Sequence, residues 1–127
     1  MNGYKVTIAE SSMELSAKEK VRLKDLSNAN RLDQMAGTSN EPFIIKPVMW
    51  AVLDVDNEHS PDKKYRKFVI VDADGNKYHT GSESFWTSFM DIFSEMNDAG
   101  ESDYEIAIYQ RESKNYAGKT FLTCSLA

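Results

Sequence analysis

Cysteine and histidine are scarce in this chain of 127 residues. The single cysteine, Cys124, cannot form an internal disulfide, which suits a reducing compartment, and it excludes a zinc site of the CxxC type. The two histidines, His59 and His79, are too few for a multi-histidine metal site. We therefore expect no metal and no cofactor, with Cys124 as a small core residue and His59 in an exposed loop.

Long apolar runs are also missing. The longest one is far shorter than the ~20 residues that a membrane-spanning helix needs. The first residues, Met1–Lys5, contain no charged-then-apolar leader, so we expect a cytoplasmic protein without membrane contact. The length predicts a single domain of residues 1–127.

Catalytic motifs are absent as well: no GxSxG, GxxxxGK[ST] or HExxH spacing occurs. Asp72 and Asp74 flank a tight turn, where aspartate commonly bonds its own backbone, so we interpret them as turn residues and not as a carboxylate dyad. The acids between Asp54 and Glu58 lack the spacing and glycine of an EF-hand and are expected in a solvated loop. No nucleophile and base are evident, and we do not expect an enzyme.

The segment Phe68–Met96 carries the clearest structural pattern. Two β-prone runs enclose an Asp-Gly tip at Asp74-Gly75, which predicts a β-hairpin. Ser82 and its neighbours offer an N-cap, and from Phe85 the aromatic side chains recur at helical spacing. We expect this helix, at about 85–96, to turn its aromatic stripe towards the core, with Trp86 docked on its shoulder.

The rest of the chain is mostly β-prone. Pro47 interrupts the longest candidate strand, Pro42–Asp56, and indicates an edge or a bulge at which a strand bends between two sheets. Lys18–Asp25 fits either a strand, with Val21 and Leu23 inward, or a helix from Ser16 to Ser27. Leu32 and Met35 are expected inward on a short helical turn. Further strands are expected at Lys5–Glu10, Tyr65–Asp72, Lys77–Thr80, Tyr104–Arg111 and Lys119–Leu126, the last with Leu122, Cys124 and Leu126 inward.

Five or more strands and one main helix before the penultimate strand do not fit a doubly wound parallel sheet. The order predicts a mainly β fold: a small antiparallel barrel of about five strands, for which the OB-fold is the leading candidate.

The net charge of −5 argues against a nucleic-acid partner. The distribution of the charges along the chain weakens this objection. Residues 81–103 contain six acids and no Lys or Arg, so removing this segment leaves the rest of the chain at +1. Clustering of cations matters more for a local groove than the total charge does.

Two segments combine aromatic and basic residues, as a platform for single-stranded nucleic acid requires. Core alternation predicts Tyr109, Arg111 and Phe121 on one outer face. The candidate phosphate contacts are Lys63, Lys64, Arg66, Lys67, Arg111, Lys114 and Lys119, and the candidate stacking rings are Tyr65, Tyr109, Tyr116 and Phe121. Ordinary amphipathic strands explain the pattern equally well, and the face of Trp50 is left open.

The order of these elements resembles the single-stranded DNA-binding proteins of tailed phages of Gram-positive bacteria. The resemblance rests on the turn Asp74–Tyr78, the helix start at Ser82–Ser84, the loop Lys114–Lys119 and the final strand Phe121–Leu126. A partial match over Lys20–Gly37 favours the strand interpretation of Lys18–Asp25.

The resemblance implies an OB-fold that coats single-stranded DNA during phage replication or recombination, in the host cytoplasm and without catalysis. Phage replication proteins and a second copy of the chain are further candidate partners. The alternative is a small acidic interaction module that uses the 81–103 surface to bind a phage or host enzyme.

Overall fold

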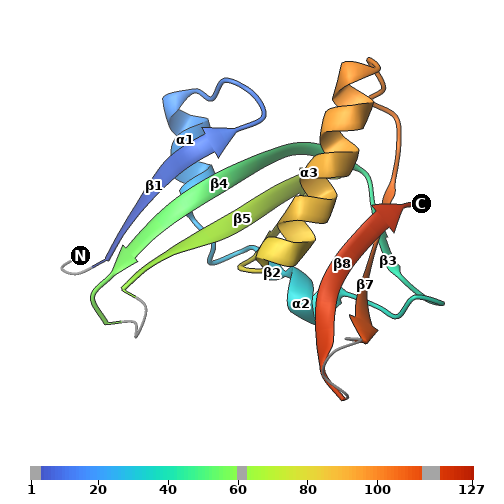
Figure 1. Cartoon of the computed structure of the whole chain (residues 1–127). Coiled ribbons are helices and arrows are strands. Elements are labelled where there is room, and N and C mark those ends of the chain that lie inside the picture. Colours follow the sequence, from blue (N-terminus) through green and yellow to red (C-terminus); the bar gives the residue numbers. More distant parts are fainter. Residues whose placement is uncertain (1–3, 60–62, 113–117) are drawn as a thin grey trace.

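The computed structural model describes residues 4–59, 63–112 and 118–127. The fold is mainly β, with two sheets and one main helix (Figure 1). One sheet has the order β1 (Tyr4–Ser11), β4 (Pro47–Asn57), β5 (Lys64–Asp72), β6 (Lys77–Thr80) and β2 (Asn30–Arg31). The other has the order β3 (Phe43–Ile45), β7 (Ile106–Glu112) and β8 (Thr120–Leu126). The helices are α1 (Ala17–Lys24), α2 (Leu32–Met35) and α3 (Glu83–Asp98). Neighbouring strands are antiparallel except β2 and β6, which run parallel.

The predicted long strand at Pro42–Asp56 is divided in two at Lys46. Its first part, β3, pairs with β7, whereas its second part, β4, pairs with β1 and β5. The β4–β5 register shifts between Pro47 and Met49, which confirms an irregularity at the proline. This bend lets one continuous segment contribute to both sheets, as expected.

The predicted hairpin and helix are confirmed. In the β5–β6 turn, Asp72 Oδ1 accepts hydrogen bonds from the backbone N–H groups of Asp74 at 3.0 Å and Asn76 at 2.9 Å. Tyr78 donates its hydroxyl to Asp72 Oδ2 at 2.8 Å, and burial, followed by this bond, raises the pKa of Tyr78 to about 12. The buried carboxylate of Asp72 therefore holds the turn, as its sequence position indicated.

Helix α3 lies between the two sheets and forms the main core with both (Figure 1). Ser82 Oγ caps it by accepting from the N–H of Phe85 at 3.2 Å. Phe85 and Phe89 are fully buried, while Trp86 stacks on Phe68 at a centroid distance of 4.7 Å. Trp50 is 9% exposed and meets Trp86 edge-on, so its side chain belongs to this core. The helix is two residues longer at each end than the aromatic pattern alone predicted.

The strand interpretation of Lys18–Asp25 is wrong: this segment is helix α1. Ser16 Oγ accepts a hydrogen bond from the N–H of Glu19. Glu19 Oε1 in turn accepts from the N–H of Ser16 at 3.0 Å, and the two bonds form a capping box. Leu23 is buried in a second apolar cluster with residues of β4 and β5, whereas Val21 is 66% exposed. Helix α1 thus covers the face of the five-stranded sheet opposite α3, which we call the outer face.

Two smaller expectations also fail. Met35 is 39% exposed although Leu32, in the same short helix α2, is fully buried. Leu126 is 50% exposed because it is the last residue of β8, although Leu122 and Cys124 in the same strand are buried as predicted. Burial raises the pKa of the Cys124 thiol to about 12, so it is a protonated core side chain at neutral pH.

No helix within the described residues is long and apolar enough to cross a bilayer.

Candidate nucleic-acid interface

The three-stranded sheet carries the first candidate cluster. Arg111 pairs directly with Phe121 across the β7–β8 ladder, and Tyr109 pairs with Thr123. Ile108 and Cys124, one position along each strand, point into the core, so Tyr109, Arg111 and Phe121 share the opposite face. We call these three residues the C-terminal patch. Arg111 is exposed and Phe121 is 38% exposed. Strand alternation alone predicted this grouping correctly.

The second predicted cluster, Lys63–Lys67, does not form a single group. Lys64 and Arg66 alternate with Tyr65 and Lys67 along β5, so these two pairs lie on opposite faces of the sheet. Lys63 precedes the strand and is exposed, with a positive φ of 44°. A single bound strand on one face of this sheet therefore meets only one of the two pairs.

Lys64 and Arg66 lie on the face towards α3. Arg66 Nε forms an ion pair with Asp54 Oδ1 at 3.1 Å, and both side chains are more than half exposed. Together with Lys5, Thr7 and Asp56 these groups line a shallow depression at the end of the sheet. Because two carboxylates neutralise part of its positive charge, this face attracts phosphate less than the sequence suggested.

Tyr65 and Lys67 lie on the outer face, where two further residues join them. In β6, His79 pairs with Val69 of β5. Val69 and Lys67 are two residues apart in β5, so His79 shares the outer face with Lys67. Arg31, in β2, is the register partner of His79. We call Arg31, Tyr65, Lys67 and His79 the outer patch. The sequence did not reveal that Arg31 and His79 belong here, since their adjacency depends on the parallel β2–β6 pairing of distant segments.

Electrostatics of the outer patch favour an anion. The Lys67 ammonium lies 6.0 Å from the centre of the Tyr65 ring. Burial first, and then the charges of Lys67 and Arg31, lower the pKa of His79 from its ordinary value. Its ring atom Nδ1 is buried and has no hydrogen-bond partner within the described residues. A negative ligand would relieve the repulsion among these groups.

The two patches are connected by a short piece of chain. Arg31 ends β2, helix α2 follows, and Gly37 then pairs with Tyr109 of β7. Gly37 donates to Ile108 O at 3.3 Å and accepts from the N–H of Gln110 at 2.9 Å. Six residue steps separate Arg31 from Gly37, which limits the distance between their Cα atoms to roughly 20 Å.

The remaining predicted residues of the β7–β8 loop are only partly described. Lys114 and Tyr116 lie outside the described residues, and Lys119, immediately before β8, is exposed. The acidic segment behaves as expected: its acids are all exposed on α3 and on the segment that follows it, away from the core. They are Glu83, Asp91, Glu95, Asp98, Glu101 and Asp103.

In the described part of the chain, no group of three or more His, Cys, Asp or Glu residues is placed to hold a metal ion. Comparison with protein-family models, curated proteins and solved structures finds no match to this chain.

Proposed function

We propose that this chain is a non-catalytic, sequence-tolerant single-stranded DNA-binding protein with an OB-fold. Its task would be to coat single-stranded DNA during phage replication or recombination in the host cytoplasm. The proposal rests on the order of the strands, on the positions of the two patches and on the resemblance described above.

The order of elements supports the OB-fold assignment. The continuous segment β3–β4 acts as a first strand shared by both sheets, β5 and β6 follow, and α3 precedes β7 and β8. An OB-fold is a five-stranded, partly open barrel with this kind of shared first strand. In the described residues no ladder joins β6 to β8, so the barrel we propose is open at that position.

One observation carries the proposal: three of the four residues of the outer patch lie on the second and third strands of this series. In OB-folds the face of strands two and three, together with the loops between strands one and two and between strands four and five, binds oligonucleotides. Tyr65, Lys67 and His79 lie on that face. The C-terminal patch flanks the loop between strands four and five, because Arg111 and Phe121 pair near the end of the β7–β8 hairpin.

The side chains in both patches suit a single strand without sequence selection. A base stacked on an aromatic ring contributes about 1–3 kcal/mol, and every base offers such a face. Tyr65, Tyr109 and Phe121 are the proposed rings, and Arg31, Lys67 and Arg111 are the proposed phosphate contacts. Duplex DNA keeps its bases stacked inside, so it gains nothing from the rings. The net charge of −5 predicts modest affinity that falls steeply with salt.

Fluorescence anisotropy with labelled oligonucleotides tests this proposal. At low salt we expect a dT oligomer of about 12–16 nucleotides to bind, and a duplex of equal length to bind much more weakly. An rU oligomer in the same titration reports the preference for DNA or RNA. Equal affinity for dT and duplex would contradict the stacking mechanism.

The acidic interaction module is the alternative, favoured by the exposure of all six acids between residues 81 and 103. It predicts no binding to any oligonucleotide, even at low salt. It also predicts that neutralising Asp91 and Glu95 leaves the fold intact but abolishes binding to a basic protein partner.

A further inference from the structure

An open pocket lies on the outer face of the five-stranded sheet, beside the outer patch. Its volume is about 520 Å³, within the range of roughly 300–1,000 Å³ that is usual for small-ligand sites. Its floor is apolar, with Leu23, Met49 and Val71. Helix α1 and the segment from Asp25 to Asn30 form one wall, and the β5–β6 turn forms the other.

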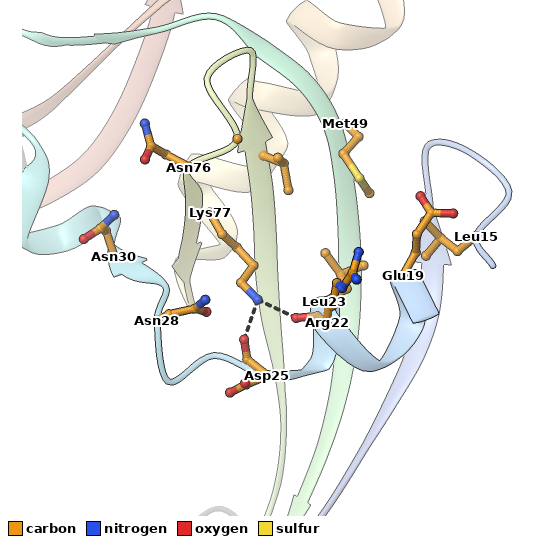
Figure 2. A pocket seen from close by; sticks show the side chains of 12 residues that line it. Leu15, Glu19, Arg22, Leu23, Asp25, Asn28, Asn30, Met49, Asn76 and Lys77 are labelled. Atoms are coloured by element: carbon orange, nitrogen blue, oxygen red, sulfur yellow. Dashed lines mark hydrogen bonds between the residues drawn. The ribbon is translucent and has the colours of Figure 1, made fainter. Parts of the chain in front are cut away.

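Lys77 crosses this pocket and holds its walls together. Its ammonium group donates to the backbone carbonyls of Arg22 and Asp25, at the C-terminal end of α1 (Figure 2). Partial burial lowers the pKa of Lys77 from its ordinary value. Because its ammonium group already donates hydrogen bonds to two backbone carbonyls, we assign Lys77 a structural role at this site.

Three asparagines belong to the polar lining, together with the charged residues Glu19, Arg22, Asp25 and Lys77. Asn28, Asn30 and Asn76 lie on the same side of Lys77 in Figure 2. Asn76 uses its Nδ2 on Asp72 Oδ2 at 3.4 Å, which leaves its amide oxygen available. Within residues 4–59, 63–112 and 118–127, the side-chain amides of Asn28 and Asn30 have no hydrogen-bond partner. Each of these two amides can therefore donate and accept at the same time.

A side-chain amide above an apolar floor matches the chemistry of a nucleobase. The flat ring system of a base packs against aliphatic side chains, and an asparagine amide pairs with N6 and N7 of adenine, accepting from one and donating to the other. The Oδ1 atom of Asp25 accepts from the N–H and the hydroxyl of Ser27, the latter at 2.6 Å, so only Oδ2 of this carboxylate remains for a ligand. We select adenine because it is the base whose donor and acceptor match the asparagine amides.

The pocket continues the outer patch without a gap in sequence. Lys77, which crosses the pocket, and His79, in the outer patch, lie two residues apart on the outer face of β6. Asn30, which lines the pocket, immediately precedes Arg31 in β2. We propose that this pocket is a base-binding subsite that accepts one adenine of a strand held on the outer patch. The inference rests on the proposed function, and it adds a preference for adenine at one position to an otherwise sequence-tolerant interface.

The test compares a dT oligomer with the same oligomer carrying one central dA, dG or dC. We expect the dA oligomer to bind about tenfold more tightly than all-dT, the lower part of the range for a bidentate base contact. In the double variant Asn28→Ala/Asn30→Ala this gain should disappear while affinity for all-dT is unchanged. Asn97→Ala, an exposed asparagine at the end of α3, is the matched control and should retain the gain. Equal affinities for the four oligomers, or a gain that survives in the double variant, would overturn the subsite.

Adenosine monophosphate provides a second readout that does not depend on strand binding. Added to the full chain, it should shift the side-chain amide NMR signals of Asn28 and Asn30, whereas thymidine monophosphate should not. If the signals shift but no oligonucleotide binds, the pocket stands and the proposed function fails. If oligonucleotides bind but the signals do not respond, the function stands and the subsite is overturned.

Discussion

Arg111 and Phe121 face each other across the β7–β8 ladder, and their side chains lie on the surface opposite the core. Directly paired side chains of antiparallel strands are about 4.5–5.5 Å apart at Cβ. A cation next to a ring that is 38% exposed offers a base a stacking surface and its phosphate a counter-charge.

The first prediction concerns the rings of this patch. Tyr109→Ala with Phe121→Ala should weaken binding of a dT oligomer by tenfold or more, since each lost stacking contact is worth about 1–3 kcal/mol. Fluorescence anisotropy at low salt measures the loss. Val48→Ala removes an apolar side chain that is 51% exposed elsewhere on the surface and should leave affinity unchanged. Unaltered affinity of the double variant would remove these rings from the interface.

The second prediction separates the two faces of β5. Lys67→Gln should reduce the salt dependence of dT binding, lowering the slope of log K against log salt by about 0.7, the value for one phosphate contact with a single strand. Lys64→Gln removes the same charge from the opposite face and should change the slope much less. If the two variants behave alike, the strand does not distinguish the faces and our assignment of the outer face is wrong.

The third prediction concerns the protonation of His79. Burial and the charges of Lys67, Arg31 and Lys77 lower its pKa from 6.5, with Asp33 opposing them. As the pH falls below 6.5, His79 takes up a proton more readily in the unfolded chain than in the folded protein. The stability that neutral His79 contributes above pH 6.5 is therefore lost as the pH falls towards the folded-state pKa.

Urea unfolding at pH 7.5 and 5.5 measures this effect. The wild-type protein should lose more stability between the two pH values than the variant His79→Gln does. His59 is exposed, so His59→Gln serves as the control and should leave the wild-type pH dependence in place. A bound dT oligomer should raise the pKa of His79, which NMR titration of the imidazole follows directly. An unchanged pKa in the complex would place the DNA away from this histidine.

The fourth prediction concerns the contact that links the two patches. A Cβ added at Gly37 would lie 1.9 Å from the carbonyl oxygen of Glu41, a distance that no real structure tolerates. Gly37→Ala must therefore displace the turn at Thr38–Glu41 or break the bonds of Gly37 to β7, and we expect a loss of about 1–3 kcal/mol in stability. At Gly81 the nearest atoms are 3.9 Å away, so Gly81→Ala should be neutral in the same thermal unfolding experiment. Equal stability of both variants would contradict this account of Gly37.

Local sequence patterns predicted those parts of the fold in which a few neighbouring residues determine the structure. The Asp-Gly turn, the Ser82 cap and the aromatic spacing from Phe85 each act within one element, and each is confirmed. The α1 segment failed for a different reason. Its alternation of basic and apolar residues favoured a strand, but the capping box at Ser16 and Glu19 is also visible in the sequence and determines the outcome.

The sequence predicted the candidate site only where a single pair of hydrogen-bonded strands determines which side chains share a face. Alternation correctly placed Tyr109, Arg111 and Phe121 on one face. The same alternation divides Lys63–Lys67 between the two faces of the sheet. Grouping these residues because they are close in sequence overlooked this division. Arg31 joins His79 through a pairing between residues 48 positions apart, and no local pattern reports such a contact.

Chemical-shift mapping with a dT oligomer tests the central claim most directly. We predict that the largest shifts in the backbone NMR spectrum fall on the outer patch and the C-terminal patch, around Lys67, His79 and Phe121. The exposed face of α3, with Asp91 and Glu95, should not respond. Shifts confined to α3, or no shifts at low salt, would contradict the proposal that these strands bind single-stranded DNA.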